Sequence, residues 1–310
     1  MKVWALHHVR FAVTDIRKTA AFASDFGLKI VSQDETQLIM RTSGGDAFCY
    51  VAELGAESAF LGMGFAVAEI KDLNEAVERH GASAIRQLNT PGGGWGVTLT
   101  DPEGLRIDLV TGVAAVAREV NSQPVSLNFP DQKSRICSAQ NTPDLGPATL
   151  FRLGHIGLYV QDFNAMVAWY QNVLGMRISD TLHAPHQSDT KIVGFLRVDR
   201  GAELVDHHTL FLAQFGKTDC HHISFESQDF EAQFVAHRWL ETRGWEANWG
   251  VGRHPLGSHV FDVWFDPDRY RWESFSDTDV VDGDKVPGNF DIHDSQMDIW
   301  SSDSPERYFQ

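Results

Sequence analysis

Two similar runs of alternating apolar and polar residues stand one in each half of the chain. The runs are residues 6–16 (LHHVRFAVTDI) and residues 153–163 (LGHIGLYVQDF). Such alternation predicts a strand with one buried face, and the aspartates near the ends of the runs, Asp15 and Asp162, are typical helix N-caps. The helical stretches that follow, 20–27 and 166–175, end at a glycine, and another strand pattern comes next. A strand–helix–strand unit therefore occurs in both halves.

Two further matches extend this repeat. Residues 64–69 (GFAVAE) align with residues 221–226 (HHISFE), and a second helical pattern follows each run, after Asp72 in one half and Asp229 in the other. The last match aligns DPEGLRID at 101–108 with DPDRYRWE at 266–273, where an Asp-Pro turn separates two short strand patterns. The chain is therefore predicted to have an α+β fold of four βαβββ-type modules in two tandem domains.

The repeats also predict the domain boundaries. One domain covers residues 1–115 and the other residues 148–280, separated by an aperiodic, proline-containing linker at 116–147. Residues 281–310 form an acidic C-terminal tail, and the sequence leaves open whether it packs on the protein's own surface or on a partner.

Composition excludes several classes of function. The 310-residue chain has a net charge of −16, which argues against a nucleic-acid binder because phosphate contacts need clustered Lys and Arg. No apolar run approaches the roughly 18–20 residues that cross a bilayer, and the start lacks the features of a signal peptide. Three widely spaced cysteines suggest no disulfide framework. We therefore expect a globular, cytoplasmic protein that binds neither nucleic acid nor membrane.

Histidine is the residue type that points to chemistry. The chain has fourteen, of which only three precede residue 155, so the excess belongs to the second half. Two imidazoles and one carboxylate on neighbouring strands would hold a metal and leave positions open for a substrate and O₂, an arrangement typical of non-haem Fe(II) sites.

Three aligned positions of the repeat decide which domain could form such a site. Each position carries a candidate ligand in the second half, but one of them carries a phenylalanine in the first. Only the second domain is therefore predicted to bind a metal. The aligned pairs are His155 with His8, His222 with Phe65, and Glu273 with Asp108.

The order and spacing of four motifs carry a family resemblance. The chain resembles the two-domain type I extradiol ring-cleaving (catechol) dioxygenases of the vicinal oxygen chelate superfamily, whose fold is also called glyoxalase/bleomycin resistance-like. The resemblance implies that each pair of modules forms an open, barrel-like sheet and that the protein assembles as a homo-oligomer. The motifs are 153–155 (LGH), 207–210 (HHTL), 221–226 (HHISFE) and the stretch from 252 to 273.

The resemblance also implies an activity. Such an enzyme inserts both atoms of O₂ into a catechol-type substrate and opens the ring next to the vicinal diol. The cofactor is Fe(II), with Mn(II) as the alternative, and no organic cofactor is needed. The partners are a small aromatic substrate and O₂.

Site residues follow by position. The metal ligands of the family match His155, His222 and Glu273. Strand alternation places His222 and Ser224 on one face and His221 on the other, although His221 stays open as the second ligand.

Two more histidines match catalytic positions of the family. His208 matches the acid–base residue beside the O₂ site, and His254 matches a residue that hydrogen-bonds a substrate oxygen. One departure is Val263, where the family commonly has a tyrosine. Because valine has no donor, the identity of the substrate is less certain than the reaction class.

Two other classes of protein use the same modules. One is a metal-dependent isomerase or lyase of the glyoxalase type, and the other is a metal-free protein that binds a small molecule. The intact set of His155, His222 and Glu273 favours the dioxygenase over the binding protein.

Overall fold

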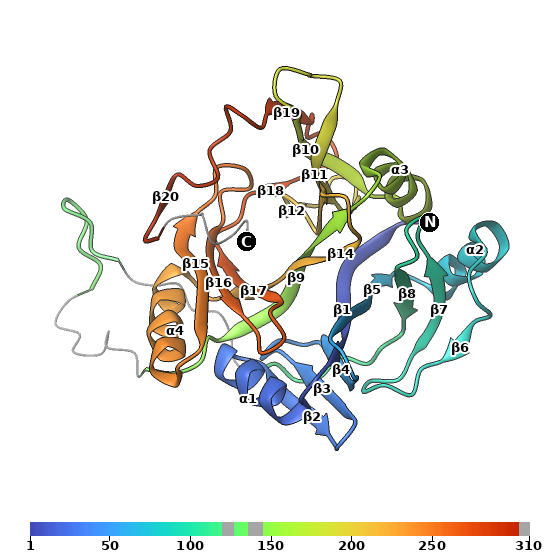
Figure 1. Ribbon diagram of the computed structural model, residues 1–310, viewed down its shortest axis with the longest axis horizontal. Coiled ribbons are helices and arrows are strands. Elements are labelled where there is room, and N and C mark those ends of the chain that lie inside the picture. Colours follow the sequence, from blue (N-terminus) through green and yellow to red (C-terminus); the bar gives the residue numbers. More distant parts are fainter. Residues whose placement is uncertain (120–126, 136–144, 304–310) are drawn as a thin grey trace.

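The computed structural model describes residues 1–119, 127–135 and 145–303. Cys137, part of the predicted linker and the end of the predicted tail lie outside these residues. Each half of the chain forms one large curved sheet (Figure 1). The predicted α+β fold of four modules in two tandem pairs is confirmed.

The first sheet contains eight strands in the order β2-β3-β4-β1-β5-β8-β7-β6. Its two modules meet where β1 and β5 pair antiparallel. The elements are β1 (Val3–Val13), α1 (Ile16–Phe26), β2 (Lys29–Gln33), β3 (Gln37–Arg41), β4 (Tyr50–Leu54), β5 (Ala59–Val67), α2 (Ile70–His80), β6 (Arg86–Gln87), β7 (Trp95–Thr100) and β8 (Arg106–Thr111).

The second sheet repeats this order, with β9 and β14 at the centre. Between β11 and β13, the short β12 (Val205–Asp206) pairs with β18 (Val280–Val281) as a separate ribbon. The other elements are β9 (Leu150–Val160), α3 (Phe163–Leu174), β10 (Arg177–His183), β11 (Lys191–Arg197), β13 (Leu210–Gln214), β14 (Asp219–Ser227), α4 (Phe230–Arg243), β15 (Glu246–Arg253), β16 (Val260–Phe265) and β17 (Arg271–Ser276).

The helix boundaries follow from local chemistry. Asp15 and Asp162 cap α1 and α3 as predicted, since their carboxylates accept hydrogen bonds from the first free backbone N–H groups. Gly175 ends α3 in the left-handed conformation, which a glycine adopts without steric cost.

The alignment of the second match is wrong by three positions. Ser224 pairs with both His155 and Glu273, and in the first domain it is Gly64 that pairs with both counterparts of those residues. The counterpart of His222 is therefore Gly62, not Phe65. A glycine offers no ligand either, so the first domain still lacks the second imidazole.

The error has a simple cause. The alignment placed Asp72 opposite Asp229, the N-cap of α4. In the structure Glu69 caps α2, and Asp72 is the third residue of that helix and completes a capping box.

The two domains share one hydrophobic core. Helices α1 and α4 lie side by side (Figure 1), and aromatic rings from both sheets meet between them. Tyr50 of the first domain lies 4.8 Å from Trp272 of the second, ring centroid to ring centroid. The junction is therefore a packed interior, which fixes the second sheet against the first. The finer domain limits at residues 115 and 148 stay a prediction.

The C-terminal tail packs on the second sheet over its described part. β19 (Gly288–Asp291) pairs with β10 at one edge, and β20 (Trp300–Ser301) pairs with β15 at the other. The tail therefore covers both sheet edges and brings its residues close to the middle of this domain.

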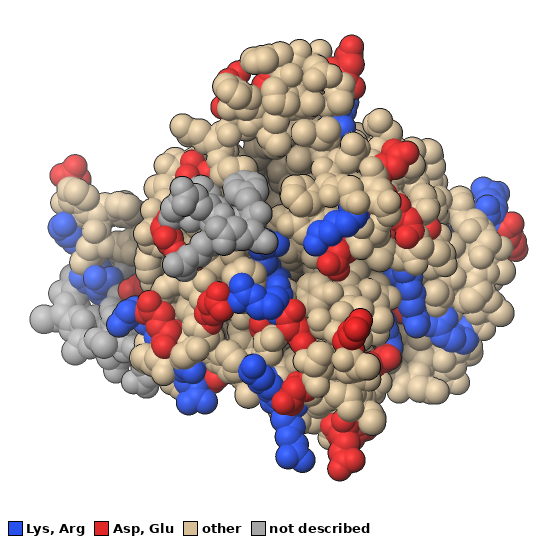
Figure 2. Space-filling model, in the orientation of Figure 1, with Lys and Arg blue, Asp and Glu red and all other residues tan. Residues whose placement is uncertain are grey.

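Charge is spread over the visible surface. Figure 2 shows acidic and basic side chains interspersed on this face, so the net charge of −16 is not gathered there in one patch. No helix in the described ranges is long and apolar enough to cross a membrane.

Candidate metal centre

Three adjacent strands bring the predicted ligands together. His155 lies on β9, His222 on β14 and Glu273 on β17, and β14 stands between the other two strands. Their ligand atoms all lie within 4.8 Å of one another. All three side chains are buried, with 1% of Glu273 and 5% of His222 exposed.

The unsatisfied groups of this cluster fit a divalent cation. The Nε2 atom of His155 lies 3.1 Å from Oε1 of Glu273, yet it has no hydrogen-bond partner of acceptable geometry among the described residues. A buried nitrogen without a partner is costly, and a cation between these atoms would satisfy it. Two imidazoles and a carboxylate are also a donor set suited to Fe(II).

The protonation states suit a metal as well. Burial lowers the pKa of His155 and lowers the pKa of His222 to about 3, so both imidazoles are neutral near pH 7. Burial alone would raise the pKa of Glu273, but the imidazoles of His155 and His259 beside it hold that pKa well below its usual range. Neutral imidazoles and an ionised carboxylate are the forms that bind metals.

Two neighbours hold the cluster in shape. The Ser224 hydroxyl donates a hydrogen bond of 2.6 Å to Oε1 of Glu273. Nδ1 of His221 lies 2.7 Å from Nδ1 of His222, which leaves the other nitrogen of His222 free for a ligand role. The ring of His221 itself packs against Tyr159, with centroids 4.7 Å apart, and is not one of the clustered ligands. Such contacts orient ligands and tune their basicity.

Gly157 leaves room for the ring of His222. The two residues face each other across β9 and β14, and a Cβ atom on Gly157 would lie 2.5 Å from the imidazole of His222. The ring of His222 therefore fills the space that a side chain at position 157 would need.

We therefore predict that Gly157→Ala weakens metal binding without removing a ligand. The methyl group should push the His222 ring aside and lower metal affinity roughly 10- to 100-fold, as changes around a ligand do. Metal titration of wild type and Gly157→Ala measures this difference. The steric control is Gly154→Ala, whose added methyl group would meet the ring of Phe275 instead of a ligand. Equal affinity of Gly157→Ala and wild type would contradict the prediction.

The acid–base candidate His208 stands beside the ligands. Its ring centroid lies 4.4 Å from that of His155, and 4% of its side chain is exposed. Burial and the nearby imidazoles lower the pKa of His208 well below its ordinary value, so the ring is neutral. A neutral imidazole can take up a proton.

A chain of hydrogen bonds fixes which nitrogen of His208 accepts that proton. Nδ1 of His208 lies 3.1 Å from Nδ1 of His207, and Nε2 of His207 lies 2.7 Å from Oδ2 of Asp180. A carboxylate only accepts, so Nε2–H of His207 donates to it, and in the neutral ring Nδ1 then has a free lone pair. Nδ1–H of His208 must then donate to His207, which leaves Nε2 of His208 unprotonated.

The tail holds Asp180 at the end of this chain. Oδ1 of Asp180 accepts hydrogen bonds from Nζ of Lys285, at 3.0 Å, and from the backbone N–H of Gly288, at 2.7 Å. The C-terminal residues thus contribute to the geometry of His208.

The fifth predicted residue, His254, also faces the site. Its Nδ1–H donates to the backbone oxygen of Met297, at 2.7 Å, and its ring stacks on Phe261 with centroids 4.1 Å apart. A ring nitrogen of His254 lies within 4.8 Å of ligand atoms of Glu273 and His259. The structure therefore brings all five predicted residues into one neighbourhood.

Two features of the site were not found from the sequence. His259 lies among His155, His208 and His254, and Asp180 supports His208 through His207. One feature of the sequence could have pointed to His259. Alternate residues of a strand face the same side, and His259 is four residues before Val263, which pairs with Glu273.

The first domain contains an incomplete version of the cluster. His8 and Asp108 lie 3.6 Å apart, and the Arg106 guanidinium pairs with the same carboxylate oxygen at 3.0 Å. A permanent cation from the chain thus neutralises Asp108.

The half-buried imidazole of His7 beside this pair makes the fold sensitive to acid. Burial and His8 lower the pKa of His7 from 6.5 to about 3. Between these pH values the unfolded chain binds a proton that the folded one does not, so this contribution to stability is complete above the upper value and is lost as pH falls. We predict that His7→Phe reduces the loss of stability on acidification. Urea denaturation at about pH 7 and about pH 5 measures this, and an unchanged difference would contradict it.

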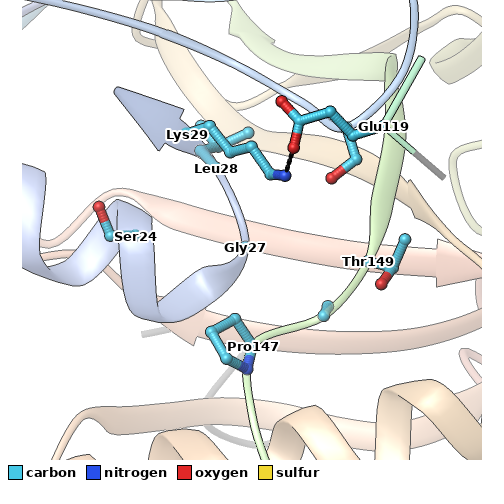
Figure 3. Close-up of a pocket in the computed structure, with 9 residues that line it drawn as sticks. Ser24, Gly27, Leu28, Lys29, Glu119, Pro147 and Thr149 are labelled. Atoms are coloured by element: carbon cyan, nitrogen blue, oxygen red, sulfur yellow. Dashed lines mark hydrogen bonds and ion pairs between the residues drawn. The ribbon is translucent and has the colours of Figure 1, made fainter. Parts of the chain in front are cut away.

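A separate cavity, away from the histidine cluster, has no comparable group of metal-binding side chains among the residues that line it. A cavity of about 370 Å³ lies between the end of α1 and the segment that leads into β9 (Figure 3), and it shares no residue with the histidine cluster. Its charged groups, Lys29 and Glu119, already pair with each other.

Comparison with known proteins gives the family of one domain. Residues 152–274 match the model of the Glyoxalase/Bleomycin resistance protein/Dioxygenase superfamily. The second half of the chain is a domain of this superfamily. It is the half that contains the histidine cluster, and its fold is that of the vicinal oxygen chelate proteins.

The alignments with two curated relatives extend over most of the chain. Metapyrocatechase 2 of Cupriavidus necator is 24% identical over 317 residues, which cover 99% of this chain and 91% of that protein. The 3-methylcatechol 2,3-dioxygenase of Pseudomonas putida is 23% identical, with 74% of this chain and 75% of that protein covered.

Solved structures share the fold. Homoprotocatechuate 2,3-dioxygenase from Arthrobacter globiformis superposes with a TM-score of 0.79 at 20% identity, over 100% of this chain and 91% of that one. The Mn(II)-bound glyoxalase from Novosphingobium aromaticivorans gives 0.79 at 22% identity, over 99% and 94%.

Proposed function

We propose that this protein is an extradiol dioxygenase that inserts both atoms of O₂ into a catechol-type substrate. The observation that carries the proposal is the buried cluster of His155, His222 and Glu273 with the neutral ring of His208 beside it. The names of the two curated relatives, a metapyrocatechase and a 3-methylcatechol 2,3-dioxygenase, support the reaction class.

In this proposal His155, His222 and Glu273 hold Fe(II), with Mn(II) as the alternative. When bound, the metal would orient the catechol and O₂ next to each other and allow electrons to pass between them. A cytoplasmic location and homo-oligomeric assembly belong to the same proposal.

The chain's own residues handle the protons. The unprotonated Nε2 of His208 accepts a proton from a substrate hydroxyl and returns it later in the reaction. His254 donates its Nδ1–H to Met297, so its other nitrogen has a lone pair that accepts a hydrogen bond from the second hydroxyl. The burial of His208 excludes water and keeps its contact with the substrate strong.

The overall reaction balances without an added reductant. Two C–O bonds form to the two atoms of one O₂ molecule, while the O–O bond and the ring C–C bond next to the diol break. The products are a carboxylic acid and a carbonyl group on one opened chain, a semialdehyde or keto acid.

A glyoxalase-type isomerase or lyase is the second candidate, because a Mn(II)-bound glyoxalase has the same fold. That reaction does not consume O₂, so oxygen uptake separates the two functions. A metal-free binding protein would neither retain metal nor consume O₂.

The test starts from protein purified without air. Metal analysis should find a single iron or manganese ion per chain, and a panel of alkyl- and aryl-substituted catechols should drive O₂ uptake and produce a yellow compound. Metal-containing protein without O₂ uptake across the panel would favour the isomerase. Absence of both metal and O₂ uptake would favour the binding protein.

A further inference from the structure

His259 is a buried imidazole without a hydrogen bond. Its side chain is 3% exposed, and neither ring nitrogen makes a hydrogen bond to a described residue. The nearest acceptor is Oε1 of Glu273, 3.5 Å from Nε2. A buried polar group left without a hydrogen bond costs about 1–3 kcal/mol, so its retention calls for a ligand.

A constrained turn directs this side chain into the site. Gly257 and Ser258, just before it, have φ angles of 80° and 56°, and the second is unusual for a residue other than glycine. The Ser258 hydroxyl donates to Asp279, at 2.8 Å, and the backbone N–H of Asp279 donates to the carbonyl of Gly257, also at 2.8 Å. Strain held in place by surrounding contacts is typical of functional sites.

His259 stands beside the same oxygen of Glu273 as His155, with the Nε2 atoms of the two rings 3.5 Å and 3.1 Å from Oε1. His155 and His222 form one group with Glu273, and His254 and His259 form a second group around the same carboxylate. The centroids of His254 and His259 are 4.8 Å apart. A substrate held beside Glu273 would therefore meet these two histidines.

We propose that His259 is a substrate-binding residue whose ring N–H donates a hydrogen bond to a catecholate oxygen beside Glu273. This assignment rests on the proposed function and specifies the group that would recognise one of the two substrate oxygens. It supplies a donor just before the strand that contains Val263, which has none and packs against Trp249 and Phe261.

The test uses 4-nitrocatechol as a coloured probe and protein loaded with Fe(II) in the absence of O₂. His259→Leu should keep its metal, because His259 is not a ligand, and should bind nitrocatechol about tenfold or more weakly, because a hydrogen bond to a charged oxygen is lost. His259→Gln, whose amide can donate, should recover part of the affinity.

Melting of the metal-free proteins separates this role from a structural one. His259→Leu removes no hydrogen bond, only the 3.5 Å contact with Glu273, so its melting temperature should fall less than that of the control variant. The matched control is His237→Leu, which should melt at a lower temperature because Nδ1 of His237 pairs with Asp262 at 2.9 Å.

Each contrary outcome is distinct. Loss of metal from His259→Leu would make the residue a ligand, and unchanged nitrocatechol affinity would remove it from the substrate site. A fall in the melting temperature of metal-free His259→Leu as large as that of His237→Leu would make the ring structural. Failure of the loaded wild type to bind nitrocatechol would overturn the proposed function together with this assignment.

Discussion

Replacing His222 by alanine should strip the metal from the protein, whereas replacing the adjacent His221 should leave it bound. His222 shares its cluster with His155 and Glu273, and removal of a direct ligand should cost more than the roughly 10- to 100-fold that supporting residues are worth. His221 lies outside the cluster and packs on Tyr159, so its loss should weaken binding only through the lost contact with His222.

Metal content after desalting and metal titration of both variants measure the difference. A second control is His8→Ala, since His8 occupies in the first domain the position that His155 has in the second. It should retain wild-type metal content. If His221→Ala lost the metal and His222→Ala kept it, the ligand assignment on β14 would be wrong.

Replacing Asp180 by asparagine should lower kcat by roughly 100-fold while metal content and KM stay close to wild type. Lys285 and the N–H of Gly288 both donate to Oδ1 of Asp180, so an asparagine must place its carbonyl oxygen there. Its NH₂ group then points at Nε2 of His207 and donates to it. The hydrogen-bond chain reverses, and His208 presents N–H to the substrate where a lone pair is needed.

Asp180 is a positioning residue, so the variant should separate kcat from substrate binding. The control is Lys285→Met, which leaves the bond between Asp180 and His207 in place and should change kcat only slightly. Wild-type kcat in Asp180→Asn would contradict the chain of hydrogen bonds as the source of His208 orientation. A parallel loss of metal would show that the residue supports the fold instead.

Much of this architecture could be predicted because the chain repeats it. The alternating runs that contain His8 and His155 predict equivalent central strands, and aspartate and glycine mark the ends of two helices. Strand alternation also places His222 and Ser224 on one face, and the Asp-Pro turn sets Glu273 on the next strand. Local pattern therefore suffices to bring the three candidate ligands together.

Other parts depend on information that a local pattern lacks. The register of β5 was wrong because Glu69 and Asp72 are both acceptable helix caps, and only the capping box shows which of them is first. Asp180 supports His208 only because β10, the residues before β13 and the C-terminal tail meet in space. His259 stands outside every motif, and its importance comes from the turn that directs it inward.

The most direct test of the central claim uses isotopically labelled O₂. Metal-loaded protein is mixed with a catechol that it consumes, and mass spectrometry of the ring-opened product counts the labelled atoms. A dioxygenase that cleaves next to the diol predicts that both atoms of one O₂ molecule appear in the product. A product without the label, or conversion of the catechol to a quinone with release of reduced oxygen, would contradict it.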